Sequence, residues 1–404
     1  MKFKKNKLYI ENVSAENIVN KFGSPTYCYS LKKLKENIKN FKKNFKRINP
    51  LICFSVKSNS NDYILKEIKL SGLGADVVSM GELLKALKNG ISAKKIVFSG
   101  VGKSYEELEY AIEKKILLIN CESESEIFDI EKIAKKKRKI VDIGIRLNPD
   151  IDAKTINKIS TGKRENKFGL TEENFLKCIK KFKNNKNLKI KCLSVHIGSQ
   201  ICSYKPYAKM LSVINKVIKK SKHFFEYIDV GGGMGIKYSN NTKSLNYKKY
   251  NSLLVNFLKK NKSKIIFEPG RSIIGDVACL LTKVLHIKKT KKINFIILDS
   301  AMNDFMRPAL YNANHRIIPS KKNKLVNNLN HEFVGPICET TDKFLSLSKF
   351  QNLSENDILA ICDVGAYGMV LSSNYNLRTK PAEVLVNKST SKIITKRQKL
   401  NNII

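Results

Sequence analysis

Short apolar runs alternate with amphipathic stretches over the first two thirds of the chain, and each run ends in polar or glycine residues. The runs that are short enough for strands cover residues 51–54, 75–78, 96–98, 116–119, 140–147, 192–197, 227–230 and 265–267. The helical patterns between them include residues 81–87, 105–112, 122–134, 172–182, 207–218 and 247–258. Eight strands that alternate with helices are typical of a parallel (β/α)8 TIM barrel, whose active site lies at the carboxyl ends of the strands. We predict this barrel over residues 34–276, since a doubly wound open sheet needs neither eight strands nor a polar residue at every strand end.

The pattern changes after Gly275, where only weak helical signals separate runs that are rich in β-branched residues. These runs cover residues 278–285, 294–298, 358–362 and 383–386, and two short strand-like pieces, 8–10 and 26–29, precede a helical pattern over 31–45. We predict a second, mostly β-sheet domain built from residues 1–33 plus 277–404. The fold class is therefore α/β, and we expect the polar tail after Asn387 to fray.

The charge of the chain changes this picture little. The 76 lysines and arginines against 35 acidic residues give a net charge of +41, which would normally suggest a nucleic-acid or anionic membrane partner. The lysines are spread from end to end, however, and their densest run, 135–139, only closes a helical pattern. We therefore predict a solvated basic surface and no nucleic-acid partner.

The cysteines and histidines indicate neither a disulfide framework nor a metal site. The nine cysteines form no Cys-x-x-Cys pair, and the five histidines lack metal-ligand spacing. No apolar core follows the basic amino terminus, and no apolar segment approaches the roughly 20 residues of a membrane helix. We expect a cytoplasmic protein with no membrane partner.

Lys57 stands where the first predicted strand meets its loop, in Phe54-Ser55-Val56-Lys57-Ser58-Asn59. Burial lowers the pKa of a lysine and leaves the neutral amine that forms a Schiff base with a carbonyl or with pyridoxal phosphate. In a chain this rich in lysine, a solvated surface lysine is the competing interpretation.

Other strand ends carry groups that suit a phosphorylated, flat cofactor. Glycines 231–233 allow backbone amides to approach a phosphate, although they also suit an ordinary tight turn. Glu268 can pair with a protonated pyridine nitrogen and Arg271 can hold an anion, or the two can form a structural pair that caps a loop. His196 can stack on a ring and Ser199 can donate to a phosphate, although a lone strand histidine also suits a core position. We further predict an active-site loop that contains residues 160–162 and 166–169.

Taken together, the motifs of the chain resemble those of one family. FSVKSN, GADVVS, HIGSQ, GGG, EPGR, MNDFMRPALY, CETTD and GAYG stand in the order seen in the diaminopimelate decarboxylases, of the alanine-racemase-like fold class of pyridoxal-phosphate enzymes. The resemblance runs from about Gly23 to Val386. It implies a pyridoxal 5'-phosphate cofactor and the decarboxylation of meso-2,6-diaminopimelate to L-lysine and CO2 in lysine biosynthesis.

The resemblance also implies a role for individual residues. Lys57 is similar to the Schiff-base lysine, and Cys338 to the proton donor that reaches the active site from the other subunit of a homodimer; a bare cysteine is otherwise a buried apolar residue. The implied cofactor-binding set is Lys57, His196, Ser199, Gly232, Gly233, Glu268, Pro269, Gly270, Arg271 and Tyr367. Arg307 offers a bidentate cation to the distal carboxylate of the substrate, and Glu339 takes its distal ammonium. The implied substrate-binding set is Arg271, Arg307, Tyr311, Glu339 and Tyr367.

The chain departs from the family pattern at Met80, at Ser300-Ala301 and at Thr340-Thr341, none of which removes a group with a chemical role. Changed loop flexibility near Glu339 is the expected effect. Two alternatives stay open at this point. One is a related decarboxylase of ornithine, arginine or carboxynorspermidine, and the other is a non-catalytic, basic binding protein.

Overall fold

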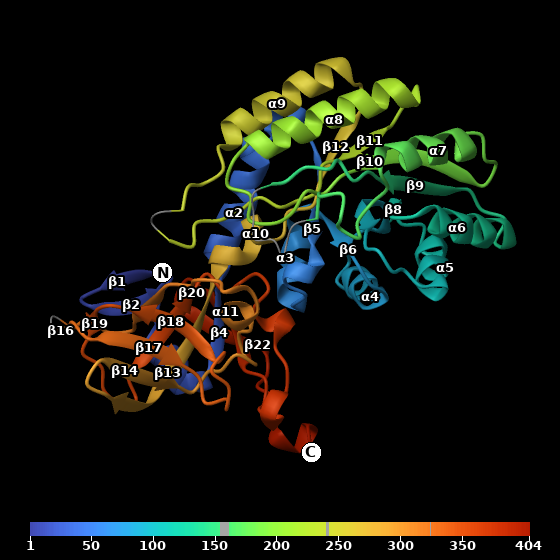
Figure 1. Cartoon of the computed structure of the whole chain (residues 1–404). Coiled ribbons are helices and arrows are strands. Elements are labelled where there is room, and N and C mark those ends of the chain that lie inside the picture. Colours follow the sequence, from blue (N-terminus) through green and yellow to red (C-terminus); the bar gives the residue numbers. More distant parts are fainter. Residues whose placement is uncertain (154–160, 240–241, 324) are drawn as a thin grey trace. The chain divides into compact units, whose positions relative to one another are not determined.

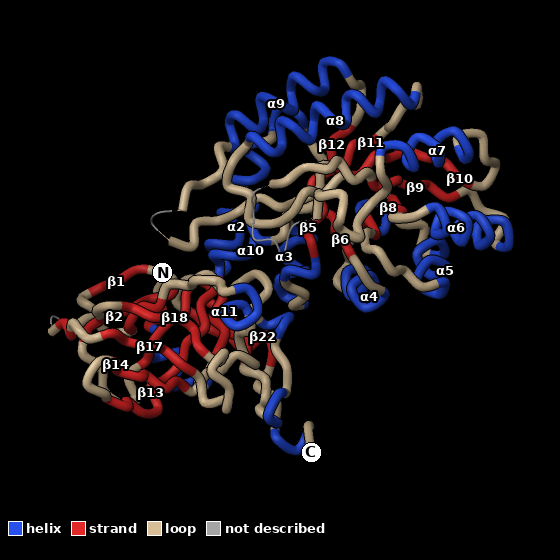
Figure 2. Tube along the Cα trace, in the orientation of Figure 1, coloured by secondary structure: helices blue, strands red, loops and turns tan. Residues whose placement is uncertain are grey.

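The computed structural model describes residues 1–153, 161–239, 242–323 and 325–404, and the chain divides into two compact units. We call Ile38–Ile236 with Lys243–Ser272 the barrel unit, and Met1–Asn37 with Lys237–Thr242 and Ile273–Ile404 the β unit. Figure 2 shows that strands dominate the β unit, whereas helices accompany the strands of the barrel unit. Lys237–Thr242 groups with the β unit although it lies inside the predicted barrel range.

The barrel unit contains a closed barrel of eight parallel strands, in the order β10-β11-β12-β5-β6-β7-β8-β9 (Figure 1). The strands are β5 (Leu51–Ser55), β6 (Gly74–Val77), β7 (Ile96–Phe98), β8 (Leu118–Cys121), β9 (Val141–Arg146), β10 (Leu188–Ser194), β11 (Tyr227–Asp229) and β12 (Lys264–Phe267). Each of the eight predicted apolar runs overlaps one of these strands, so the predicted TIM barrel is confirmed.

Helices alternate with the barrel strands, and lysines stand in the last turn of several of them. The longer helices are α2 (Leu31–Asn44), α3 (Asp62–Leu70), α4 (Met80–Lys88), α5 (Tyr105–Glu113), α6 (Glu124–Lys136), α7 (Glu172–Phe182), α8 (Lys205–Ser221) and α9 (Tyr247–Lys260). Side chains such as Ser79 and Ser123 accept a backbone amide hydrogen bond at helix starts. Lysines such as Lys135 and Lys136 occupy the last turn, where cations are favourable because the helix dipole is negative there.

The interior of the barrel changes from apolar to polar within two residues along five strands. A buried apolar layer consists of Cys53, Val97, Leu118, Cys192 and Ile266. Because side chains alternate along a strand, the residues two positions further on point the same way. These residues are Ser55, Ser99, Asn120, Ser194 and Glu268, and all five are buried. A barrel interior is usually filled with branched apolar side chains, so this polar layer marks the place where chemistry is built.

In the described residues, the β unit contains a nine-stranded sheet, a three-stranded sheet (β1-β2-β3) and a two-stranded sheet (β16-β19). Its strands are β1 (Lys2–Lys4), β2 (Lys7–Ile10), β3 (Val13–Ser14), β4 (Thr26–Ser30), β13 (Ala278–Lys289), β14 (Ile293–Leu298), β15 (Ile317–Pro319), β16 (Val326–Asn327), β17 (Asn330–Val334), β18 (Lys343–Leu347), β19 (Phe350–Gln351), β20 (Ile358–Cys362), β21 (Ala382–Asn387) and β22 (Thr390–Thr395). The short helices α1 (Ala15–Phe22) and α11 (Arg307–Tyr311) accompany them, and α10 (Arg271–Ile274) spans the boundary between the two units. The predicted mostly β domain is thus confirmed as a fold class.

The expectation that the tail frays after Asn387 is wrong for β22. This strand pairs antiparallel with β21, from Asn387 opposite Thr390 to Glu383 opposite Thr395. Thr395 also donates a side-chain hydrogen bond of 2.6 Å to the Glu383 carboxylate. The backbone pairing holds a polar sequence in place that carries little apolar signal of its own. Among the described residues, no helix has the length and apolar character needed to cross a bilayer.

Candidate active site

A cavity of about 400 Å³ opens at the carboxyl ends of the barrel strands. Its lining contains three of the predicted residues, Lys57, His196 and Glu268, together with Ser99 and Arg146. The amine, the imidazole and the carboxyl group come from β5, β10 and β12, which are remote from one another in sequence. The structure therefore brings together three side chains that the sequence placed at separate strand ends.

Lys57 lies in the 3-10 turn that follows β5, in contact with a buried acid. Its Nζ atom is 3.0 Å from Oδ2 of Asp76, and the Ser55 hydroxyl donates to the same oxygen at 2.7 Å. The Asp76 side chain is fully buried, whereas that of Lys57 is 38 % exposed. The expected burial of Lys57 is therefore only partial, and the carboxylate of Asp76 is what holds its amine at the edge of the cavity.

Glu268 directly follows β12 and is almost completely buried. It accepts a hydrogen bond of 3.0 Å from the Ser99 hydroxyl. Burial, followed by the nearby carboxyl groups of Asp229 and Asp76, holds the pKa of Glu268 well above its usual range. A carboxyl group in this setting is poised to take a cationic partner, which would replace the solvation that burial removes.

His196 follows β10 and keeps a neutral imidazole ring. Its Nδ1 atom accepts a hydrogen bond of 3.2 Å from the Gly232 amide, so the ring proton resides on Nε2. Burial and then the cationic neighbours Arg146 and Lys57 lower the pKa of His196 well below its ordinary value. A neutral, fixed, flat ring suits stacking against an aromatic group better than it suits a charge pair.

The predicted phosphate contacts form a cradle that has no room for side chains. A Cβ atom added to Gly232 would lie 2.1 Å from the Glu268 carbonyl oxygen, and one added to Gly233, whose φ is +81°, would lie 2.2 Å from the Gly198 carbonyl oxygen. A Cβ atom on Gly270 would lie 2.9 Å from the Ser58 side chain. Glycine is therefore required at these positions because the backbone segments approach one another closely.

Cationic and hydroxyl donors stand beside this cradle. The buried Arg271 guanidinium donates to the Ser199 hydroxyl at 3.1 Å. Pro269 contributes its carbonyl oxygen, which accepts from the Ser55 amide at 3.1 Å and ties the loop after β12 to β5. Backbone amides, a hydroxyl group and a guanidinium are the donors that phosphate prefers, so the residues of the barrel unit fit pyridoxal phosphate.

The remaining predicted residues, Arg307, Tyr311, Cys338, Glu339 and Tyr367, belong to the β unit. Arg307 begins α11 and is buried, and its Nε atom donates to Nε2 of His315 at 3.3 Å. Its guanidinium carbon lies 5.4 Å from the ring centre of Tyr238 and 5.9 Å from that of Tyr311. Two aromatic rings and an imidazole thus hold a buried arginine in one orientation.

The Cys338-Glu339 segment lies on an ordered loop. The buried Asp342 carboxylate accepts from the Met302 amide at 2.7 Å and from the Ile337 amide at 2.8 Å, which fixes the loop from behind. Cys338 itself is exposed. It is therefore available for chemistry, and the alternative of a buried apolar cysteine is wrong.

Glu339 is held by two hydroxyl groups. Tyr375 donates to one carboxylate oxygen, and Thr341 donates to the other at 3.0 Å. Thr341 is one of the departures from the family pattern, and it adds a contact to Glu339 instead of loosening it. Tyr367, at the other predicted position, is half-buried and has a φ of +57°, a backbone conformation that non-glycine residues adopt rarely.

Part of the predicted active-site loop lies outside the described residues, which resume at Thr161. Within the described part, the Thr161 hydroxyl donates to the His196 carbonyl oxygen at 2.9 Å. The Phe168 ring lies 4.8 Å from the guanidinium carbon of Arg146. Thr161, Lys167 and Phe168 all line the cavity that contains Lys57, so this segment does belong to the site.

Sequence reasoning missed two acids in the site, Glu82 and Asp229. Glu82 lies in the first turn of α4, and its carboxyl group accepts from the Val78 amide at 2.9 Å. Burial and then the Asp76 carboxylate raise the pKa of Glu82 to about 7, against the opposing influence of the Val78 amide and Lys57. One signal in the sequence could have identified Asp229. It is an acid within a predicted apolar strand, and a buried acid usually has a polar or charged partner.

The raised pKa of Glu82 predicts a pH-dependent stability. The folded protein binds this proton up to about pH 7, whereas the unfolded chain releases it near its ordinary pKa of 4.5. The free energy of unfolding of wild type, relative to that of Glu82→Gln, should therefore fall by up to about 3 kcal/mol as the pH rises from 4.5 to 7. Urea unfolding of both proteins across this range measures the difference. Parallel stability curves would show that Glu82 does not hold a proton in the folded state.

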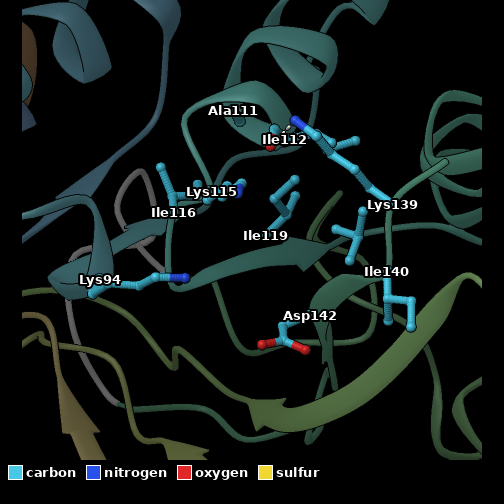
Figure 3. Close-up of a pocket in the computed structure, with 10 residues that line it drawn as sticks. Lys94, Ala111, Ile112, Lys115, Ile116, Ile119, Lys139, Ile140 and Asp142 are labelled. Carbon is cyan, nitrogen blue, oxygen red and sulfur yellow. Dashed lines mark hydrogen bonds between the residues drawn. The ribbon is translucent and has the colours of Figure 1, made fainter. Parts of the chain in front are cut away.

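A second cavity in the barrel unit, of about 330 Å³, contains none of the predicted residues. It lies between the end of α5 and the starts of β8 and β9, as Figure 3 shows. Isoleucines such as Ile116 and Ile119 line it, with the lysines Lys94, Lys115 and Lys139. Barrel enzymes place their chemistry at the carboxyl ends of the strands, so we assign no role in the reaction to this cavity.

Comparison with known proteins is consistent with this geometry. The sequence profile described as pyridoxal-dependent decarboxylase, pyridoxal binding domain, matches residues 31–275. The diaminopimelate decarboxylase of Aquifex aeolicus is 40% identical over 412 residues, which cover 100% of this chain and 96% of that protein. The crystal structure of diaminopimelate decarboxylase from Helicobacter pylori complexed with L-lysine has 38% sequence identity and a TM-score of 0.90, and the match covers 96% of this chain and 98% of that one.

A more distant structure has the same overall fold. The diaminopimelate decarboxylase of M. jannaschii, in co-complex with L-lysine, has 33% sequence identity and a TM-score of 0.94, with 100% of this chain and 96% of that one covered.

Proposed function

The chain belongs to the diaminopimelate decarboxylase family of pyridoxal-dependent decarboxylases, and we propose that it converts meso-2,6-diaminopimelate to L-lysine and CO2. The observation that carries this proposal is the cavity at the carboxyl end of the barrel that Lys57, His196 and Glu268 line together. The reaction is the last step of lysine biosynthesis, and we place it in the cytoplasm, in keeping with nine free thiols.

The barrel unit would hold the cofactor. Lys57 supplies the amine that attaches it, His196 stacks on its ring, and Glu268 pairs with its pyridine nitrogen. The close-packed glycines, with Ser199, Pro269 and Arg271 beside them, take the phosphate, and Tyr367 of the β unit completes the set. When bound, pyridoxal phosphate supplies the electron sink that accepts the electron pair left by departing CO2.

The β unit would supply the substrate contacts and the final proton. Arg307 pairs with the distal carboxylate of the substrate, with Tyr311 and Arg271 in support, and Glu339 takes the distal ammonium. Ornithine, lysine and arginine lack the distal carboxylate, so the Arg307 guanidinium would gain no carboxylate partner from them. Cys338 gives a proton to the carbon that has lost CO2, which completes the reaction in favour of lysine.

Incubation of the purified protein with meso-diaminopimelate tests this function. We expect L-lysine to accumulate when pyridoxal phosphate is present, and expect none after the cofactor is removed by dialysis against a carbonyl-trapping reagent. Lysine formation that does not depend on the cofactor, or cofactor binding without lysine formation, contradicts the proposal.

The proposal includes a homodimer with shared active sites, in which Lys57 of one subunit works with Cys338 of the other. Lys57→Ala and Cys338→Ala homodimers should each be inactive. A mixture that has exchanged subunits should regain up to about a quarter of the wild-type activity per site, because random pairing gives half heterodimers and each has one intact site. Native mass spectrometry of the mixture confirms the exchange. Complete exchange with no recovery of activity would exclude a shared site.

A further inference from the structure

Two carboxyl groups, those of Asp229 and Glu268, form a buried pair inside the barrel. Asp229 is the last residue of β11 and lies opposite Ile266 of β12, so Glu268, two residues further on, points to the same face of the sheet. Asn120 links the two acids, because its amide group donates to Asp229 at 3.0 Å and to the Ser99 hydroxyl at 3.3 Å, and Ser99 donates to Glu268. Two buried carboxylates on one face of neighbouring strands repel each other, so one member of the pair carries a proton.

The neighbours of the pair decide which member carries it. Asp229 accepts from the Gly231 amide at 2.9 Å and from the Asn120 amide group at 3.0 Å, with the Ser194 hydroxyl at 3.5 Å. Three donors converge on this one acid, which favours its ionised form. Within the described part of the chain, Glu268 accepts from one side-chain hydroxyl, that of Ser99. The proton therefore resides on Glu268.

The charged and titratable groups that face the pair reinforce this assignment. They come from five elements and are Lys57, Asp76, Cys53, Cys192 and Tyr250. Burial, opposed by the donors to its carboxylate, raises the pKa of Asp229 to about 6, which leaves it ionised at neutral pH. Burial and the charge of Asp229 together keep the pKa of Glu268 far higher.

We propose that Asp229 is a positioning residue that keeps Glu268 protonated in the protein without cofactor, so that Glu268 delivers this proton to the ring nitrogen of pyridoxal phosphate. This inference rests on the proposed function. In the step, the O–H bond of Glu268 breaks and an N–H bond forms at the ring nitrogen. Glu268 becomes the carboxylate that pairs with the ring cation, and Asp229 stays ionised throughout.

The consequence is a proton balance that depends on Asp229. In wild type, a cofactor with a neutral ring nitrogen receives its proton from within the site. In Asp229→Asn, the negative neighbour is gone, so Glu268 loses its proton at a lower pH. At about pH 8, cofactor binding to the variant should then take up more protons from solvent than binding to wild type does, by up to about one per site.

Calorimetric titration of the full-length, cofactor-free protein with pyridoxal phosphate measures this balance. Titrations at about pH 8 in buffers of different ionisation enthalpy give the number of protons taken up, which needs no catalytic turnover. Ser99→Ala is the matched control, because it removes a hydrogen bond to Glu268 but no charge, and its proton uptake should equal that of wild type. Equal uptake by wild type and Asp229→Asn overturns the proposal. Failure of wild type to bind the cofactor at all rejects the proposed function as well.

Infrared spectroscopy provides a second test that does not require the Asp229 variant to fold. The difference between cofactor-free wild type and Glu268→Gln at about pH 8 should contain the carbonyl stretch of a protonated carboxylic acid, which shifts in D2O. The absence of this band means that Glu268 is ionised, and the proposal is then wrong whether or not the protein binds pyridoxal phosphate.

Discussion

Replacement of Lys57 by alanine should lower the decarboxylation rate by a factor on the order of 10³ or more, because the variant lacks the amine that we propose attaches the cofactor. The same variant should lose the visible absorbance of the bound cofactor. In wild type, borohydride should remove that absorbance and fix the cofactor to a peptide that contains Lys57.

Two further variants separate chemistry from structure. Lys57→Arg keeps a cation beside the buried Asp76 carboxylate, which lies 3.0 Å from the lysine amine, but it cannot form the covalent link. It should therefore be as inactive as Lys57→Ala while it unfolds closer to the wild-type temperature. Lys189→Ala removes an exposed lysine of β10 and should retain wild-type activity and absorbance. If Lys57→Arg turns over substrate at a wild-type rate, Lys57 is not the attachment point.

Replacement of Arg307 by alanine should reduce kcat/KM for meso-diaminopimelate by about 100-fold or more, because the distal carboxylate loses its charged partner. Cofactor absorbance should remain, since the cofactor-binding residues other than Tyr367 belong to the barrel unit. Arg307→Lys keeps the charge but loses the planar fork that matches a carboxylate, so its kcat/KM should lie between those of wild type and Arg307→Ala.

Arg316 is the matched control for this prediction. It belongs to the same unit, and its guanidinium pairs with Asp363 at 3.0 Å with a side chain that is 49% exposed. Arg316→Ala should change kcat/KM by only a few-fold, since half-exposed Arg316 belongs to neither the cofactor-binding nor the substrate-binding set. Equal turnover by wild type and Arg307→Ala would falsify the substrate assignment and point to a ligand without a distal carboxylate.

The barrel could be predicted from sequence because polar or glycine residues follow each short apolar run and so mark the end of each strand. Lys57, His196 and Glu268 were found in this way. Asp229 was missed because it stands inside the predicted apolar run 227–230, whereas the structure ends β11 at this residue and pairs β11 directly with β12, which Glu268 follows. The contact from Tyr375 to Glu339 was also out of reach, because 36 residues separate the two and neither lies in a periodic element.

The tail strand β22 shows the limit of hydrophobic patterning. Its sequence, TSKIIT, contains two isoleucines and three hydroxyl residues, so it carries no alternating apolar signal. Backbone hydrogen bonds to β21 form the strand, and this pairing leaves no signal in the amino-acid composition of the segment. The solvated basic surface stays a prediction. Some of its exposed lysines pair with acids of neighbouring helices, as Lys181 does with Glu124.

The central claim is that this chain removes CO2 from an amino acid that carries a distal carboxylate. The most direct test is CO2 release by the pyridoxal-phosphate-loaded protein from meso-diaminopimelate, L-lysine, L-ornithine and L-arginine under identical conditions. We predict release from meso-diaminopimelate that exceeds release from each of the other three by at least about 100-fold. Comparable or greater release from ornithine, lysine or arginine would contradict the account.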